Sequence, residues 1–513
     1  MKINSSRQIF LLISLLTITP FILFLGKNFL FIEFFTPKYF WSTIIYSIFF
    51  IGIATFIIFF SKSFLILALF FAYFSFLQFY FHDMQEILRI YKNGSTGFYV
   101  LFFIIFISFI ATLCSNFSIF RNFIFIFLFL NIAISMNNLI PTTVGFLKTF
   151  FKTTNIVDSS LNTKKFKSVK YPNIFYIIPD GLTSPKILNE YIEIDYKDSI
   201  KKFEEKGFNV QEHNYSSYNA SYLTLAALFK MDYPMTENST IYKDRSEFYP
   251  AIRRKNPELL LYLKRNGYKF IIAPPLWGGC PPLIVAKCLE PKSNSYIDFF
   301  LADYAIATLL DNSLLKKILY KYLIIQDHKM NDSIKTTLNQ MKISPKIWSE
   351  GGVFTMIHAM MPHHPYREED CSITDRYTPP SKEGYKSSVY CIFNRIHELS
   401  DYIIKKYPNA SIVVQSDHGV SPKSYSMEHK KRIKDLRFVE LSGSLIDYKL
   451  GNFTAVRGCD SNQAAKLNQV NIVKYIVECL VGRKLPKQLE NKSYFGFSES
   501  SPDYGKVFRV HQK

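Results

Sequence analysis

The sequence of 513 residues has no Cys-x-x-Cys pair, no signal-peptide cleavage site after its first apolar run, and few acidic residues near its N-terminus. None of its seven cysteines forms a Cys-x-x-Cys pair, which disfavours a zinc site built from cysteines. The first apolar run has no small-residue cleavage site after it, which argues against a removable signal peptide. Acidic residues are scarce near the N-terminus: residues 1–150 carry three Asp or Glu against nine Lys or Arg. That segment is dominated by Phe, Ile and Leu instead.

Five apolar runs follow one another in the first 140 residues, separated by short polar breaks. They cover residues 9–26, 39–61, 64–82, 98–114 and 121–137. Each is close to the ~20 residues that cross ~30 Å of hydrocarbon. One run alone could be a buried core helix, but five in series predict an α-helical transmembrane domain over residues 1–140. The charges that flank the runs are balanced, so they do not set the orientation.

The chain is basic, with a net charge of +20 at pH 7. A basic protein often binds nucleic acid or an anionic surface. Because this chain is predicted to be tethered to a bilayer, anionic lipid head groups are the better partner and no nucleic acid is expected. Residues 141–170 form a basic juxtamembrane linker, where each lysine near such a surface could gain ~1 kcal/mol. A solvated run of charges is the alternative for its last lysines, Lys164, Lys165, Lys167 and Lys170.

Six of the seven cysteines follow the predicted membrane domain. An even number suits disulfides in an oxidising compartment. Cys280 and Cys288 bracket a loop that contains proline and are the favoured pair. Buried, unpaired thiols are the alternative.

The pattern changes at Tyr171, where short apolar strands begin to alternate with helical stretches, as in a parallel α/β sheet. Residues 275–300 are interpreted as an insertion or candidate lid, and the polar residues 421–437 as a mobile loop. Strands are expected over residues 173–179, 269–274, 353–358 and 411–416, and helices over residues 184–206, 222–230, 256–265, 384–406 and 463–482.

Two of the expected strands end in residues of the metal-ligand type. The run NIFYIIP leads into Asp180-Gly181, and the run SIVVQ leads into Asp417-His418-Gly419 after one serine. Ligands of open α/β sheets bind just outside the carboxyl ends of the strands. Carboxylates and an imidazole gathered there suit one Mn²⁺, Mg²⁺ or Zn²⁺ ion. An ordinary turn is the alternative for each motif taken by itself.

A nucleophile is expected in the stretch NYSSYNASYLTL, where Ser221 stands directly before a helical run. A hydroxyl at a helix N-terminus lies where backbone N–H groups favour an anionic phosphoryl group. The competing readings are that Ser221 is only an N-cap, or that Thr224, one turn further on, is the reactive hydroxyl.

Three histidines lie within seven residues of one another, at the end of the run VFTMIHAMMPHHP. An imidazole there could contact phosphate oxygens or protonate a leaving group. The residues concerned are His358, His363 and His364; solvent-exposed loop histidines without a role are the alternative.

Taken in order, these segments resemble the sulfatase-like branch of the alkaline phosphatase superfamily. The closest likeness is to membrane-bound phosphoglycerol and phosphoethanolamine transferases of the lipoteichoic acid synthase type. PNIFYIIPDG resembles the family's first metal strand, NYSSYNASYLTLAALFKMDY its nucleophile segment, and IVVQSDHG its second metal strand. GNFTAVR and VNIVKYIVECL resemble its closing strand and helix. The resemblance covers residues 171–480 and the multi-span anchor.

The resemblance implies an α/β/α sandwich over residues 171–513 and a role for each candidate residue. Asp180, Asp417 and His418 would bind the metal, and Ser221 would be both nucleophile and fourth ligand. His363 would contact the substrate and act in catalysis, while His358 and Thr224 are further candidates for substrate contact. The protein would be a multi-pass protein of a bacterial cytoplasmic membrane, with its catalytic domain on the extracytoplasmic side.

One departure from the family is that serine stands where a threonine is usual. A sulfatase is disfavoured, because Ser221 is followed by neither the proline nor the arginine of the Cys/Ser-x-Pro-x-Arg motif. The predicted function is metal-dependent transfer of a phosphoglycerol or phosphoethanolamine group from a phospholipid to an envelope glycan or lipid. A phosphodiester or sulfate-ester hydrolase, and a catalytically silent scaffold in surface-polymer assembly, are the alternatives.

Overall fold

The structure is a computed structural model, and its described part begins at Tyr171. The described residues all belong to one compact unit, formed by Lys165–Lys292 and Ile324–Lys513. The five predicted spans, the linker and most of the candidate lid lie outside them. Across the described part, no helix is both long and apolar enough to cross a bilayer. The described residues are 171–190, 192–237, 258–273, 287–289, 332–364, 366–372, 374, 381–420, 443–483, 490–496 and 507–510.

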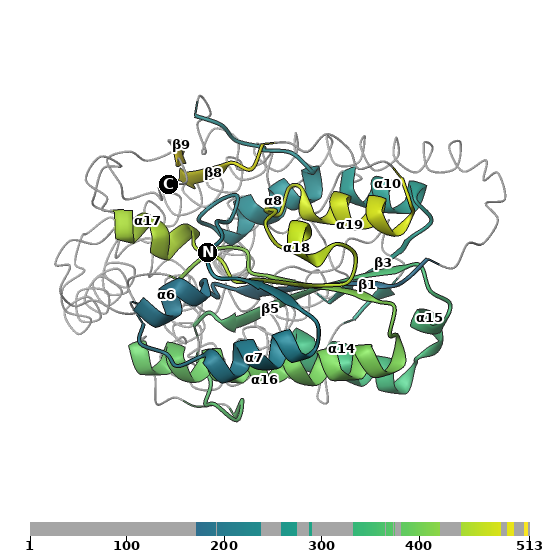
Figure 1. The fold of residues 1–513 in the computed structure, drawn as a ribbon, viewed down its shortest axis with the longest axis horizontal. Coiled ribbons are helices and arrows are strands. Elements are labelled where there is room, and N and C mark those ends of the chain that lie inside the picture. Colours follow the sequence, from purple (N-terminus) through teal and green to yellow (C-terminus); the bar gives the residue numbers. More distant parts are fainter. Residues whose placement is uncertain are drawn as a thin grey trace, which may run out of the picture. The chain divides into compact units, whose positions relative to one another are not determined.

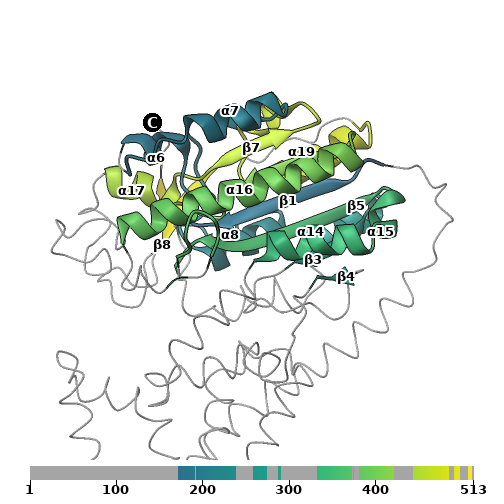
Figure 2. The same ribbon diagram turned by 90° about the horizontal axis from the view of Figure 1, so that it is seen from below.

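A seven-stranded sheet forms the centre of this unit, in the order β2-β7-β6-β1-β5-β3-β4 (Figures 1 and 2). The central strand β1 pairs in parallel with β5 on one side and with β6 on the other. All seven residues of β1 are buried, as expected for a continuous apolar run inside a parallel sheet. The strands are β1 Ile174–Asp180, β2 Asn209–Gln211, β3 Lys269–Ala273, β4 Lys287–Cys288, β5 Val353–Pro362, β6 Ser411–Gln415 and β7 Thr454–Arg457.

The sheet is mixed, which corrects the expectation of a purely parallel one. Strand β7 is antiparallel to β6, and β2 is antiparallel to β7. The cause is visible in the register, where Thr454 at the start of β7 pairs with Gln415 at the end of β6. The chain therefore leaves and re-enters the sheet at the same edge, without a crossover. A separate antiparallel hairpin is formed by β8 Ser493–Gly496 and β9 Val507–Val510.

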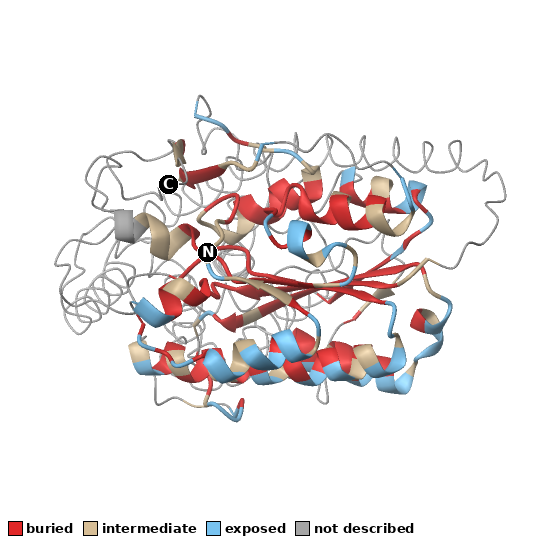
Figure 3. Cartoon of the chain, viewed as in Figure 1, coloured by how far each residue is buried: buried red, intermediate tan, exposed pale blue. Residues whose placement is uncertain are grey.

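Helices cover both faces of the sheet, so the predicted α/β/α layering is present (Figure 1). Each face has its own apolar cluster, and buried residues run along the strands between the two layers (Figure 3). One layer contains α6 Pro185–Glu190, α7 Lys197–Glu205, α14 Ser333–Ile343 and α16 Lys382–Lys406. The other contains α8 Ser221–Lys230, α10 Glu258–Arg265, α18 Ser461–Ala464 and α19 Ile472–Leu480.

Several predicted boundaries differ from the structure. The helix expected over 184–206 is two helices, α6 and α7, and that over 463–482 is α18 and α19. Helices α14, α15 Lys346–Ser349 and α17 Gly443–Leu450 were not predicted. Within the candidate lid, Lys287 and Cys288 pair with β3, so this part of the segment joins the sheet edge.

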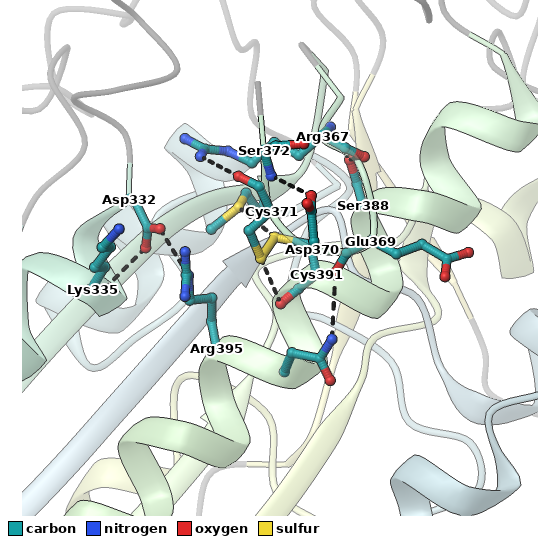
Figure 4. The surroundings of a disulfide bond; sticks show 12 residues. Asp332, Lys335, Arg367, Glu369, Asp370, Cys371, Ser372, Ser388, Cys391 and Arg395 are labelled. Atoms are coloured by element: carbon teal, nitrogen blue, oxygen red, sulfur yellow. Dashed lines mark hydrogen bonds and ion pairs between the residues drawn. A yellow bond between two sulfur atoms is a disulfide. The ribbon is translucent and has the colours of Figure 1, made fainter. Parts of the chain in front are cut away.

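Two disulfides lie within the described residues, Cys371–Cys391 and Cys459–Cys479, with Cα separations of 5.0 Å and 6.2 Å. The first fastens the loop after β5 to α16 (Figure 4). The general expectation of disulfides is met, although neither pair was predicted. Cys288 is also disulfide-bonded. Its predicted partner Cys280 lies outside the described residues, so the pairing Cys280–Cys288 stays a prediction.

Removing either disulfide should cost stability by a similar amount, because both close loops with a sequence separation of 20. In the entropic model, such a loop contributes roughly 3 kcal/mol. We expect the double variants C371S/C391S and C459S/C479S to lose comparable free energy of unfolding in urea titrations. Free-thiol labelling of unreduced, denatured protein checks the oxidised state. Six reactive thiols from the domain would contradict both the disulfide pairings and the predicted oxidising compartment.

A buried histidine on α16 predicts acid-sensitive stability. The exposed fraction of His397 is 7%, and its ring packs 4.3 Å from that of Phe203. Burial, together with the charges of Lys206 and Lys202, lowers its pKa from 6.5 to about 4. Between those pH values the unfolded chain binds a proton that the folded chain does not, so stability falls as the pH drops from about 6.5 to about 4.

The variant His397→Leu should therefore unfold less readily in acid than the wild type does. Between pH 7.5 and pH 4, the free energy of unfolding of the variant should rise by about 2–3 kcal/mol compared with that of the wild type. Urea titrations across this pH range measure it. Parallel pH dependence of the two proteins would contradict the assignment.

Candidate metal and nucleophile site

Two buried carboxylates meet at the carboxyl edge of the sheet. Asp180 is the last residue of β1, and Asp417 follows the neighbouring parallel strand β6 by two residues. Both are nearly inaccessible to solvent. Asp417 Oδ1 accepts hydrogen bonds from the backbone N–H groups of Gly181, at 3.0 Å, and His418, at 2.9 Å. The other oxygen, Asp417 Oδ2, lies 3.6 Å from His418 Nε2 and 3.9 Å from His358 Nε2.

The imidazole of His418 is oriented by its own turn. Its Nδ1 lies 2.6 Å from the carbonyl oxygen of Gly419, so Nδ1 is the protonated nitrogen. Its Nε2 then has its lone pair facing the carboxylates, 3.7 Å from Asp180 Oδ1 and 3.6 Å from Asp417 Oδ2. A carbonyl that fixes the tautomer in this way is the usual support of a metal-binding histidine.

The Ser221 hydroxyl joins this group. It lies 3.3 Å from Asp180 Oδ2 and 3.1 Å from His418 Nε2. Ser221 is the first residue of α8, and the N-cap is Ala220 in an extended conformation. The alternative that Ser221 serves only as an N-cap is therefore wrong.

The competing hydroxyl is occupied elsewhere. Thr224 is fully buried and donates to the carbonyl oxygen of Tyr218 at 3.0 Å. That carbonyl belongs to the segment that precedes α8. The structure thus brings Ser221 to the carboxylates and ties Thr224 to the backbone.

His358 lies deeper than the sequence suggested. It stands inside β5, opposite Ile178 of β1, and not at the strand end. Its Nε2 is 3.6 Å from Asp180 Oδ2 and 3.9 Å from Asp417 Oδ2. The ligand atoms of Asp180, His358 and Asp417 all lie within 4.8 Å of one another. The residue predicted as a substrate contact is therefore placed where it could bind a metal.

His363 and His364 lie on the loop that follows β5. The backbone N–H of His363 donates to the carbonyl oxygen of Asp180 at 3.1 Å, and its side chain is exposed. His364 is half-buried and packs edge-on against Tyr366, with ring centroids 5.4 Å apart. Burial and the nearby His363 lower the pKa of His364. His363 is thus the more exposed of the two histidines on this loop.

The donor set fits a divalent cation. Asp180 Oδ1 and Asp417 Oδ2 are buried carboxylate oxygens that accept no hydrogen bond from any described residue. Burial raises the pKa of Asp180, but the imidazoles of His363, His358 and His418 outweigh it, and the net pKa lies below its usual range. Asp180 is therefore ionised. Two buried carboxylates without full hydrogen bonding call for a cation, and imidazole with carboxylate suits zinc or manganese.

One residue that supports the site, Tyr385, was not found from the sequence, and a second, Gly419, was found only as the glycine of the Asp-His-Gly motif. Tyr385 of α16 is buried, donates its hydroxyl hydrogen to Gly181 O at 2.8 Å and accepts from Thr183 N at 3.2 Å. Gly419 packs so closely on the end of α17 that a Cβ atom would clash with the carbonyl oxygen of Tyr448. A tyrosine in an amphipathic helix gives no signal of such a role, since it resembles any core residue.

No protein-family model matches the chain, and neither does any curated protein. Among solved structures, the chain is similar to the C-terminal periplasmic domain of EcEptC from Escherichia coli. That match has a TM-score of 0.39 and 12% identity, and covers 67% of this chain and 93% of that one.

Two further solved structures are similar to this chain. The lipooligosaccharide phosphoethanolamine transferase A from Neisseria meningitidis, an integral membrane protein, has a TM-score of 0.36 and 10% identity, covering 94% of this chain and 97% of that one. The phosphonate monoester hydrolase SpPMH from Silicibacter pomeroyi has a TM-score of 0.41 and 12% identity, covering 63% and 75%.

Proposed function

We propose that the protein is a membrane-anchored, metal-dependent transferase. It would move a phosphoglycerol or phosphoethanolamine group from a phospholipid to an envelope glycan or lipid. The observation that supports this most directly is the position of the Ser221 hydroxyl, 3.3 Å from Asp180 and 3.1 Å from His418 at the carboxyl edge of the sheet. A hydroxyl beside a group of metal-type ligands is the arrangement that nucleophilic phosphoryl transfer requires.

Asp180, Asp417, His418 and Ser221 would hold the metal, and His358 is close enough to join them. A divalent cation bound there would ease loss of the Ser221 proton and neutralise charge on the phosphate. Ser221 also opens α8, a helix of ten residues, whose N-terminal dipole favours an anion at the same place.

The reaction would proceed in two displacements at phosphorus. In the first, Ser221 Oγ forms a bond to phosphorus while the bond from phosphorus to the diacylglycerol oxygen breaks, so that diacylglycerol is the leaving group. His363 donates a proton to that oxygen, and the Ser221 proton leaves to solvent, from which His363 is reprotonated. In the second, an acceptor hydroxyl attacks phosphorus, Ser221 Oγ is released, and it takes up the proton that the acceptor loses.

Mass spectrometry of the Ser221 peptide tests this proposal. The full-length protein is incubated with labelled phosphatidylglycerol or phosphatidylethanolamine, and the added mass identifies the transferred group. We expect an adduct on Ser221 that disappears when a glycan or lipid acceptor is added. Release of the group to water alone would identify a hydrolase instead. Purified protein without metal and without an adduct would indicate a silent scaffold.

A further inference from the structure

A buried glutamine lies just outside the site and joins the two segments that carry it. Gln469 stands in the connection between α18 and α19, with an exposed fraction of 1%. Its Oε1 accepts hydrogen bonds from the backbone N–H of Ser217, at 2.9 Å, and from the Ser217 hydroxyl, at 3.1 Å. Its Nε2 donates to the carbonyl oxygen of Ser416 at 2.8 Å.

Both partners of Gln469 lie within four residues of a site residue in the sequence. Ser217 precedes the nucleophile Ser221 by four residues, in the segment that leads into α8. Ser416 directly precedes Asp417. The side-chain amide of Gln469 therefore links the segment that presents the nucleophile to the segment that presents a metal ligand. About 200 residues separate these two segments in the sequence.

The orientation of this amide is dictated by its neighbours. A backbone N–H can only donate and a backbone carbonyl can only accept, so Oε1 must face Ser217 and Nε2 must face Ser416. Both Ser217 and Ser416 are completely buried, which means that water cannot replace a lost partner. Buried polar groups without a partner carry a desolvation penalty, so the three bonds hold each segment firmly in place.

Each segment has a second, independent support. The carbonyl oxygen of Ser416 also accepts from Asn452 Nδ2 at 3.2 Å. The carbonyl oxygen of Ser217 accepts from the backbone N–H of Tyr494 at 2.9 Å. Loss of the Gln469 amide would therefore shift the two segments relative to each other without unfolding either one.

We propose that Gln469 is a positioning residue that sets the place of the Ser221 hydroxyl relative to Asp417 and His418. The inference rests on the proposed function, because it concerns the reactivity of Ser221. A misplacement of about 1 Å in a reacting group can cost about 100-fold in rate. Replacing Gln469 should accordingly lower kcat about 10- to 100-fold. KM should change by less than about threefold, and Zn²⁺ should still bind, because Asp180, Asp417, His418 and His358 all keep their side chains.

Two variants of the full-length protein test the proposal. Gln469→Met keeps the length of the side chain and removes all three hydrogen bonds. Gln469→Glu keeps an acceptor for Ser217 but puts a carboxylate oxygen against the Ser416 carbonyl oxygen. The assays are turnover of bis(4-nitrophenyl) phosphate, Zn²⁺ titration, and mass spectrometry of the Ser221 adduct, together with urea unfolding.

The matched control is Asn173→Leu. Asn173 is also a buried amide that joins two backbone segments, because its Nδ2 donates to Trp348 O at 2.8 Å and its Oδ1 accepts from Val353 N at 3.1 Å. It precedes β1, at the end of the strand opposite to Asp180. This variant should lose stability but keep the kcat of its folded fraction.

The outcomes separate the inference from the proposed function. We expect both Gln469 variants to bind Zn²⁺ and to form the adduct at least tenfold more slowly, with Asn173→Leu unaffected. A folded Gln469 variant with kcat within twofold of the wild type would overturn the positioning role alone, as would an equal loss of kcat in Asn173→Leu. A wild-type protein that forms no Ser221 adduct overturns the proposed function and this inference together.

Discussion

Replacing Ser221 by alanine should abolish turnover and leave the fold intact. The hydroxyl is the group that bonds to phosphorus in the proposed reaction, and it lies at hydrogen-bonding distance from both Asp180 and His418. Loss of an enzyme's serine nucleophile can cost about 10⁶-fold in kcat. Stability should change by no more than about 0.5 kcal/mol, because Ser221 is not the N-cap and alanine favours helix. Steady-state kinetics with a chromogenic phosphodiester, and urea unfolding, measure the two effects.

Two companion variants show that the effect belongs to this hydroxyl. Ser221→Thr keeps the hydroxyl oxygen at the same position and should remain active. Thr224→Ala should retain measurable activity, because its hydroxyl is bound to Tyr218 O. That variant should lose about 1 kcal/mol of stability with the lost hydrogen bond. Normal turnover by Ser221→Ala with a dead Thr224→Ala would place the nucleophile one helical turn further along.

The parts of the fold that the sequence predicted best are those with local signals. Strands β1 and β6 are short apolar runs ended by Asp-Gly or Asp-His-Gly, and both were expected within a residue or two of their observed bounds. Asp180 and Asp417 meet because these strands are parallel neighbours, as the rule about carboxyl strand ends anticipates. The order of the strands itself is not encoded in any short segment of sequence.

The supporting contacts could not be predicted, because they join positions far apart in the chain. Tyr385 reaches Gly181 across 204 residues, and Gln469 reaches Ser217 across 252. Neither residue breaks the local pattern of its own segment. The depth of His358 was missed for a related reason: β5 is buried on both faces, so alternation along the strand does not tell a core position from a site position.

The glycine of the Asp-His-Gly motif was identified from the sequence, but the packing that requires a glycine there was not. The sequence suggested a turn glycine. In the structure, Gly419 N donates to Lys449 O at 2.9 Å, and a Cβ would lie only 2.6 Å from the carbonyl oxygen of Gly451. The absence of a side chain is thus required by the close approach of the chain at the end of α17. The His418 turn is therefore packed against the end of α17, a contact that the sequence alone could not show.

Replacing Asp417 should remove the metal from the protein. Its Oδ2 is one of the buried ligand atoms, and its Oδ1 holds the Gly181 and His418 backbone N–H groups. Asp417→Ala deletes both functions, so it should lose metal and also stability, because two buried donors are left without an acceptor. The loss of affinity should exceed the roughly 10- to 100-fold that is typical of an outer-shell partner.

The variant Asp417→Asn separates these two roles. The amide can keep Oδ1 as the acceptor for Gly181 and His418, but it removes the negative charge from the ligand position. We expect it to be nearly as stable as the wild type and yet poor in metal by elemental analysis of the purified full-length protein. Asp332→Ala is the matched control, since Asp332 is a buried carboxylate outside the site that pairs with Arg395 at 3.0 Å. It should keep its metal; full occupancy in Asp417→Ala would show instead that these ligands do not form the metal site.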